Sequence, residues 1–271
     1  MGVCISANFD NPRIWLSSGV ARANELGVPG YGPNALVPRA WREANVREQE
    51  LLFSHSQEEL RAESCIGVYR LPVEFRDRIG HLKLGQASRL EEFVEFVQEQ
   101  EFQTLQRDLI DFFKPFLKTE NQFLPMSPTF NSAGLETVTQ EGPSGKLLGL
   151  HLDSWDQTPL SDRHQSSNRI SINLGKSDRY LLFVNLTMQQ ILAALPDQKF
   201  NEKLNEQSVV ASFLGNNMNY PVVKVRIAPG EAYVSPTENI IHDGSSSGQA
   251  ISDVHLTMRG FFRVDVRTWK S

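Results

Sequence analysis

Apolar residues recur at the helical period between positions 88 and 116, which makes this stretch the clearest predicted helix of the chain. Ser88 and Glu91 have the spacing of a capping box, in which a hydroxyl and a later carboxylate satisfy free N–H groups of the first turn. Pro115 should bend or end the helix, because proline cannot donate the helical hydrogen bond. The apolar positions are Leu90, Phe93, Val94, Val97, Leu105, Leu109, Phe112, Phe113 and Phe116. We expect a buttress helix, in one or two pieces, that packs against a sheet.

From about residue 123 the pattern changes to short apolar runs and alternations separated by turn residues, which is typical of a β sandwich or barrel. The strands 168–175 and 179–186 are expected to form a hairpin through the turn Gly-Lys-Ser-Asp. The full set of predicted strands is 123–129, 134–140, 146–153, 168–175, 179–186, 208–214, 222–228, 231–235, 239–242 and 254–267.

The remaining segments complete a single domain. Residues 1–45 are rich in Gly, Pro and Asn and are expected to form an irregular lead-in. Residues 41–62 and 188–204 are expected to be helical, with Pro196 interrupting the second segment. Because no internal repeat or long linker divides the chain, we expect one domain over 1–271. It would consist of an irregular and helical buttress at 1–122 and a β core at 123–267.

Composition narrows the class of protein. The 271 residues carry a net charge of −5, which argues against a nucleic-acid partner or a basic membrane-binding face. No apolar run approaches the roughly 18 residues of a membrane span, and the N-terminus lacks the pattern of a secretion signal. Cys4 and Cys65 form neither a metal-ligand spacing nor a disulfide framework, which favours a cytoplasmic location. Whether the chain forms a homodimer is left open.

The candidate chemistry begins at His151 and Asp153, which lie two positions apart on the predicted strand 146–153. Side chains at this spacing leave a strand on the same face, so an imidazole and a carboxylate would stand side by side. His242 lies far downstream, on the predicted strand 239–242. Two His and one carboxylate on one face of iron(II) form the facial triad of non-haem oxygenases, which leaves metal positions open for other ligands.

A final long strand places His255, Thr257 and Arg259 on one face, with Phe261 and Arg263 continuing it. His-x-Asp, a distant His and then an Arg on the following strand resembles the iron(II)- and 2-oxoglutarate-dependent oxygenases. The resemblance covers roughly residues 123–267. It implies a mainly β fold with flanking helices, in which a double-stranded β-helix (a jelly-roll, cupin-like core) is buttressed by the N-terminal helices.

The resemblance also implies roles for individual residues. His151, Asp153 and His242 would be the iron ligands, and Arg259 would bind the distal carboxylate of 2-oxoglutarate through its guanidinium fork. Many family members have Ser or Thr two positions after this Arg. Because Phe261 stands there, Thr257 would supply the hydroxyl, and Arg263 is the alternative clamp.

The implied reaction uses iron(II), 2-oxoglutarate and dioxygen to hydroxylate an unactivated C–H bond of a small molecule, with release of succinate and CO₂. Such an enzyme is a non-haem iron dioxygenase. Halogenating relatives have Gly at the position of Asp153, so the carboxylate favours hydroxylation, or else desaturation or cyclisation.

The substrate is expected to be an amino acid or a specialised metabolite. The polar segment 154–168 directly follows the metal strand and could close over the site. The candidate substrate-binding residues in and beside it are Trp155, Asp156, Arg163, His164, Asn168 and Arg169.

Two other hypotheses about the function stay open. A cupin-like metalloenzyme without a keto-acid cosubstrate usually presents His-x-His on its first metal strand, whereas this chain has Asp153 at the second position. A non-enzymatic jelly-roll binding module would use the same His and Asp side chains for structure alone, and would bind no iron.

Overall fold

The computed structural model describes residues 2–9, 13–53, 60–119, 122–142, 144–195 and 205–269. Its described part is mainly β, and no sheet closes into a barrel. Two sheets share an apolar core that includes Ile5, Ile66 and Tyr233 of one sheet and Phe183 and Val225 of the other. Burying each large apolar side chain contributes about 1.5–3 kcal/mol, so this shared core holds the two sheets together.

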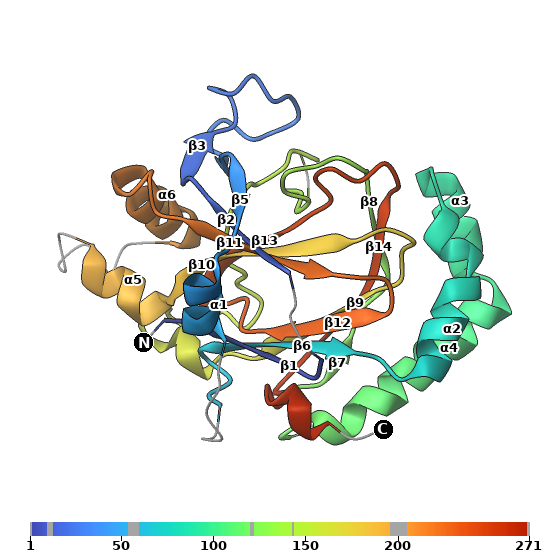
Figure 1. Ribbon diagram of the computed structural model, residues 1–271. Coiled ribbons are helices and arrows are strands. Elements are labelled where there is room, and N and C mark those ends of the chain that lie inside the picture. Colours follow the sequence, from blue (N-terminus) through green and yellow to red (C-terminus); the bar gives the residue numbers. More distant parts are fainter. Residues whose placement is uncertain are drawn as a thin grey trace.

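The larger sheet has seven strands, and helices cover its outer face (Figure 1). In spatial order its strands are β1 (Cys4–Ala7), β6 (Cys65–Arg70), β12 (Glu231–Ser235), β9 (Asn168–Asn173), β14 (Asp253–Gly260) and β7 (Leu124–Pro125), with β8 (Thr129–Asn131) also paired to β14. The smaller sheet runs β13 (Ile240–Ser245), β10 (Arg179–Thr187), β11 (Val222–Ile227), β2 (Ile14–Ser17) and β5 (Trp41–Glu43). A separate hairpin pairs β3 (Val20–Arg22) with β4 (Leu36–Pro38).

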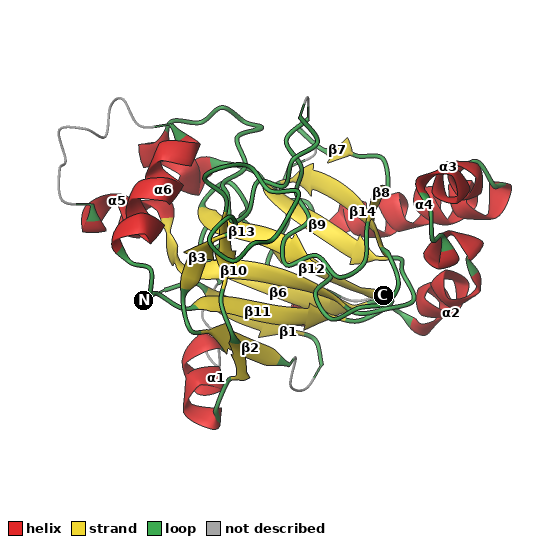
Figure 2. Cartoon of the chain, turned by 90° about the horizontal axis from the view of Figure 1, so that it is seen from above, coloured by secondary structure: helices red, strands yellow, loops and turns green. Residues whose placement is uncertain are grey.

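Helices α2 (Val73–His81), α3 (Leu90–Val97) and α4 (Gln100–Phe113) lie together on one side of the sheets, and α5 (Met188–Ala194) and α6 (Glu206–Asn216) lie on the opposite side (Figures 1 and 2). The short helix α1 (Val46–Leu52) adds Leu52 to the shared core. Strand alternation explains this layering, because successive side chains point to opposite faces. Ile170 and Ile172 of β9 pack against the helical layer, whereas Arg169 and Ser171 point between the sheets.

Half of the ten predicted strands are confirmed. The predicted strands 168–175, 179–186, 222–228, 231–235 and 239–242 correspond to β9, β10, β11, β12 and β13. The predicted hairpin is wrong, because β9 pairs with β12 and β14 while β10 pairs with β11 and β13. The turn between them therefore carries the chain from one sheet to the other.

Other strand predictions are corrected. The segment 146–153 is not a regular strand and makes only isolated bridges at Leu147 and His151, and 134–140 makes one at Gln140. The segment 123–129 contributes only β7 and the first residue of β8, and the last strand ends at Gly260. The segment 208–214 lies in α6, because Asn205 and Ser208 form a capping box at its start.

The helical predictions are partly confirmed. The buttress is indeed in two pieces, α3 and α4, followed by a 3₁₀ turn that contains Pro115. Ser88 bonds to the side chain of Glu92 instead of Glu91, with both contacts at 3.0 Å, because the helix begins at Leu90. Within 188–204 only α5 is described, and the segment from Pro196 to residue 204 lies outside the described residues.

The N-terminal segment is more regular than its composition predicts. Residues 1–45 supply β1–β5, and 41–62 forms β5 and α1 before the undescribed residues 54–59. Ile14 and Leu16 alternate into the shared core, which gives β2 its place in the smaller sheet.

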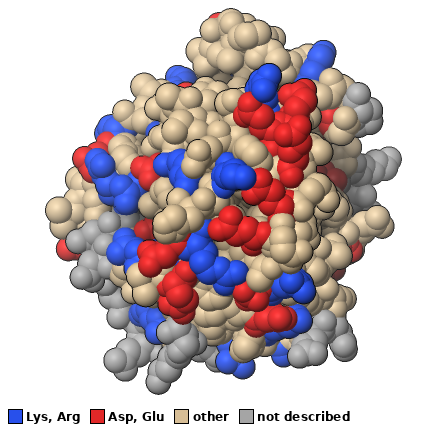
Figure 3. All heavy atoms as spheres, turned by 90° about the vertical axis from the view of Figure 1, so that its right-hand side faces the viewer, with Lys and Arg blue, Asp and Glu red and all other residues tan. Residues whose placement is uncertain are grey.

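On the face formed by α2–α4, basic and acidic side chains are interspersed (Figure 3). None of the helices in the described ranges is both long enough and apolar enough to cross a membrane.

Candidate metal centre

His151 and His242 meet across a short backbone bridge that extends the edge of the smaller sheet. The N–H of each donates to the carbonyl of the other, at N–O distances of 3.0 Å and 2.9 Å. Directly bridged residues present their side chains on the same face, and the two imidazole centroids lie 4.7 Å apart. The two His, which the sequence assigns to one site, are therefore brought together by a bridge between the 146–153 segment and β13.

Gly149 explains how the chain reaches this bridge. Its φ of +75° breaks the extended run, and a Cβ there would lie 2.6 Å from the carbonyl oxygen of Leu36. The next residue donates its N–H to the same carbonyl at 2.8 Å. Only glycine tolerates both the left-handed conformation and the close approach, so this position fixes the path of the chain two residues before His151.

Asp153 completes a compact group with the two His. Its Oδ1 lies 3.6 Å from Nε2 of His151, and its Oδ2 lies 3.8 Å from Nε2 of His242. One ligand atom from each residue lies within 4.8 Å of the others. The side chains of His151, Asp153 and His242 are 12%, 8% and 0% exposed. Two imidazole nitrogens and one carboxylate are donors that suit a divalent transition metal such as iron(II).

The hydrogen bonds of His242 leave one nitrogen as an acceptor. Nδ1 lies 3.3 Å from the carbonyl oxygen of Ile240 and must donate to it, while Nε2 faces a guanidinium nitrogen of Arg169 at 3.2 Å. Because arginine only donates, Nε2 carries the lone pair that a metal requires. Burial lowers the pKa of His242 well below its ordinary value, which keeps the ring neutral.

The pKa values of His151 and Asp153 are shifted in opposite directions. Burial disfavours charge on His151, but Asp243 and Asp153 outweigh it and raise the pKa of the imidazole to about 10. Burial also opposes charge on Asp153, yet the charges of Arg169 and His151 hold its pKa well below the ordinary value. A metal would take the place of the proton on His151, because only neutral imidazole is a ligand.

Asp243 lies behind His151 and orients it. It is fully buried, and its Oδ1 accepts from the N–H of Thr139 at 3.2 Å and of Gly244 at 2.7 Å. Its Oδ2 has no hydrogen-bond partner and lies 3.4 Å from Nδ1 of His151, which donates to the Gly149 carbonyl at 3.0 Å. A carboxylate behind a ligating imidazole is the usual way in which proteins fix its tautomer and orientation.

Arg259 lies beside the triad but is already paired. Its Nη2 contacts Glu238 and lies 3.1 Å from Asp156 and 3.0 Å from the hydroxyl of Ser167. Its buried Nη1 has no hydrogen-bond partner and lies 3.9 Å from Oδ2 of Asp153. Thr257 occupies the same inner face of β14. Arg263 follows the end of that strand and is exposed, which separates it from the buried group.

The segment after Asp153 divides into residues near the site and residues that hold structure. Trp155 is largely exposed and its ring stacks over Arg259, with the guanidinium 5.5 Å from the ring centroid. Arg163 is buried and binds Glu238 at 2.8 Å, and it also contacts Glu206. These charge pairs hold the segment that follows Asp153 beside the candidate metal group.

The other predicted substrate residues are differently placed. Asn168 uses both ends of its amide on the backbone of Phe262, at 2.8 Å and 3.0 Å, so it ties two chain segments together. His164 lies in a 3₁₀ turn, Leu160–Gln165, and faces Gln189 at 3.0 Å. Arg169, in contrast, touches the metal-binding atoms themselves.

Sequence reasoning missed Glu238 and Asp243, which compensate Arg259 and orient His151. The available signal was their position on either side of His242, in a stretch of otherwise largely uncharged residues. Buried carboxylates are rarely left without a partner, so acidic residues in an apolar strand predict nearby cations. Which cations these were could not be predicted without the fold.

A second polar group lies between the sheets. Asp253 is buried and pairs with Nε of Arg179 at 3.0 Å and with Nδ1 of His255 at 3.3 Å. Asn131 donates to the same carboxylate at 2.9 Å. Burial and the nearby Arg179 lower the pKa of His255, whereas Asp253 opposes that shift.

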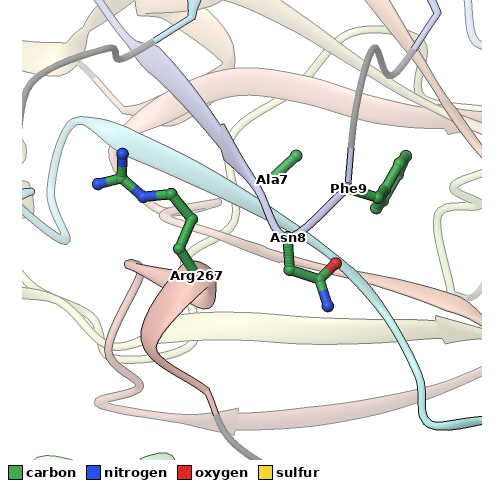
Figure 4. A pocket seen from close by; sticks show the side chains of 4 residues that line it. All are labelled: Ala7, Asn8, Phe9 and Arg267. Atoms are coloured by element: carbon green, nitrogen blue, oxygen red, sulfur yellow. The ribbon is translucent and has the colours of Figure 1, made fainter.

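Two surface hollows, of about 280 and 400 Å³, lie elsewhere. The smaller is lined by Ala7, Asn8, Phe9 and Arg267 (Figure 4). No triad residue is among the described residues that line either hollow, so we assign them no part in metal chemistry.

A comparison of the chain with protein-family models finds no match, and a comparison with curated protein sequences finds none either. Any functional assignment therefore depends on the buried group of His151, Asp153 and His242 and on the residues around it.

Proposed function

We propose that the protein is an iron(II)- and 2-oxoglutarate-dependent oxygenase that hydroxylates a small molecule. The observation that carries this proposal is the buried group of His151, Asp153 and His242, whose donor atoms match a facial triad. We also propose that the two sheets form a double-stranded β-helix core. This is supported by the passage of the chain between sheets, since β9, β12 and β14 lie in the larger sheet and β10, β11 and β13 in the smaller.

Iron and the keto acid would supply the oxidising power. The residues of the chain bind and orient. His151, Asp153 and His242 would hold the metal, and Asp243 keeps the His151 ring in position. Trp155 and the charge-paired segment around Arg163 lie beside the group and would limit the access of water. Because a carboxylate stands at position 153, we propose hydroxylation, desaturation or cyclisation of the substrate.

The resemblance assigns the distal carboxylate of 2-oxoglutarate to Arg259. Binding there would have to replace a contact with Glu238 or Asp156, since both already lie against the same guanidinium nitrogen. Because Glu238 and Asp156 already balance the charge of Arg259, a second candidate function is favoured, a metalloenzyme that uses no keto acid. The two candidates differ in whether 2-oxoglutarate binds to the metal-loaded protein.

The test is an anaerobic titration with iron(II), and with cobalt(II) as a spectroscopic substitute, followed by 2-oxoglutarate and a substrate screen that measures succinate. We expect the parent to bind one metal ion, and His151→Ala and His242→Ala to lose at least about a hundredfold in affinity, because a ligand matters more than its supporting residues. Asp153→Gly should retain weak binding through the two His but lose turnover. His164→Ala is the matched control, since this His lies outside the triad.

Two results would separate the alternatives. A parent protein that binds no metal would exclude every metalloenzyme and leave a binding module. A parent that binds metal but has no affinity for 2-oxoglutarate would exclude the oxygenase and favour the second candidate.

A further inference from the structure

Arg169 contacts two of the side chains that would bind a metal ion. Its Nη1 lies 3.2 Å from Oδ2 of Asp153, and its Nη2 lies 3.2 Å from Nε2 of His242. These are a carboxylate oxygen and an imidazole nitrogen of the candidate metal group. Oδ2 of Asp153 is buried and has no hydrogen-bond partner, so its contact with Arg169 is an ion pair without a well-aligned hydrogen bond.

Arg169 also differs from its neighbouring arginines in how its charge is compensated. Arg259 has Glu238 and Asp156, and Arg163 has Glu238 and Glu206. Within the described ranges, the only carboxylate within 4.0 Å of Arg169 is that of Asp153. If Asp153 ligates a metal, Arg169 is the guanidinium that has to share its carboxylate with that metal.

The strand pairing adds a second reason to expect an anion here. Arg169 of β9 and Arg259 of β14 are direct partners in the antiparallel register. Like charges opposite one another destabilise a sheet unless an anion lies between them. Asp153 fills this role, at 3.2 Å from Arg169 and 3.9 Å from Arg259.

We propose that Arg169 competes with a metal ion for the candidate metal group and, when a metal is bound there, binds the carboxylate of a keto acid at its metal-binding end. A divalent cation cannot share the single lone pair of His242 Nε2 with the guanidinium of Arg169, and the two cations repel each other. The displaced side chain, 20% exposed, stays at the edge of the group and needs a new anion. A carboxylate that itself ligates the metal would be the nearest anion, and its two oxygens suit the planar guanidinium of arginine.

This inference rests on the proposed function, and its two halves are tested separately. The first half concerns the metal alone. Arg169→Met should bind cobalt(II) about tenfold more tightly than the parent, since the competing cation is gone. Arg263→Met, which removes an exposed charge, should change the affinity by less than about twofold. Arg259→Met should gain much less than Arg169→Met, because Arg259 does not contact His242.

The second half uses two keto acids with the metal-loaded, oxygen-free protein. 2-Oxoglutarate has a distal carboxylate, whereas 2-oxopentanoate has only the metal-binding end. Arg169→Met should weaken both by about thirtyfold or more, as expected when a buried carboxylate loses its partner. Arg259→Met should weaken 2-oxoglutarate alone if Arg259 binds the distal carboxylate. Arg169→Gln serves as a second variant, and circular dichroism confirms that each variant is folded.

The outcomes are distinct. Unchanged metal affinity in both Arg169 variants would overturn the first half, and unchanged keto-acid affinity would overturn the second. A loss confined to 2-oxoglutarate in the Arg169 variants would also overturn it, by assigning Arg169 to the distal end. A parent that binds metal but neither keto acid would instead overturn the proposed function, while the metal titration of Arg169→Met would still test the first half.

Discussion

At the scale of single residues, Asp243 shows how the fold surrounds His151. One carboxylate oxygen is held by the backbone N–H groups of Thr139 and Gly244, which leaves the other facing the imidazole. A carboxylate outside the candidate metal group therefore lies against the His151 ring. This contact could not be predicted from the sequence, because the partner segment around Thr139 lies far away in the chain.

We predict that Asp243→Asn weakens metal binding by about 10–100-fold, the usual effect of removing a carboxylate behind a ligating His. The amide can still accept from Thr139 and Gly244, so the fold should be kept. Cobalt(II) titration measures the affinity, and the thermal unfolding midpoint of the metal-free variant serves as the control. Parent-like affinity in a folded variant would show that Gly149 alone orients His151.

His255 provides a prediction about pH. Burial and Arg179 lower its pKa below the ordinary 6.5, so the folded protein resists a proton that the unfolded chain accepts. Its contribution to the free energy of unfolding is therefore present above about pH 6.5 and is lost as the pH falls below that value.

We predict that the free energy of unfolding falls less between pH 7 and pH 5 in His255→Gln than in the parent, with both proteins measured without metal. Urea unfolding at pH 5, 6 and 7 would measure both proteins. The two curves should converge as the pH falls. Parallel curves would mean that His255 titrates alike in the folded and unfolded states. Asp253 does not contribute to the change in stability between pH 5 and pH 7, because its lowered pKa affects stability only at lower pH.

At the scale of elements, the sequence predicted the strands better than their partners. The residues of β9 and β10 alternate clearly, but alternation is the same whether two strands pair with each other or enter opposite sheets. The pairing is decided by distant strands such as β12 and β13. The error at 208–214 has a local cause, since β-branched Val209 and Val210 favour a strand while the cap at Asn205 begins a helix.

His151, Asp153 and His242 lie together as the sequence predicts, although the strand predicted over 146–153 is not formed. His151 and Asp153 converge through an irregular segment whose path is set by Gly149 and a single bridge to His242. Convergence therefore depends on a glycine that the strand prediction treated as ordinary.

We predict that Gly149→Ala destabilises the protein by roughly 2 kcal/mol or more and weakens metal binding. The strain has two parts, a left-handed φ of +75° and a Cβ placed 2.6 Å from the Leu36 carbonyl. Gly145→Ala is a matched control, because Gly145 has a φ of +65° but no atom within 4 Å of the added Cβ. Denaturant unfolding of both variants separates the parts. Equal losses would show that Leu36 can move aside at no cost.

At the scale of the whole molecule, the two sheets are assembled from both ends of the chain. β6 lies between β1 and β12, and β2 lies between β5 and β11 (Figure 1). Each sheet therefore joins strands from before residue 71 to strands from after residue 221. Of the triad, His242 lies on the later strand β13, and the core of the two sheets also contains Ile5, Ile66 and Val68 from the earlier strands.

This arrangement makes a prediction about the proposed division at residue 122. A fragment of residues 123–267 would lose β6 from beside β12 and β2 from beside β11, which exposes two unpaired strand edges and half of the shared core. We expect this fragment to lack a cooperative unfolding transition and to bind no metal, whereas the full chain should show both. Far-UV circular dichroism, thermal unfolding and cobalt(II) titration of the two proteins provide the comparison. A fragment that unfolds cooperatively and binds cobalt would show that the β core is an independent domain, and that the N-terminal strands only extend its sheets.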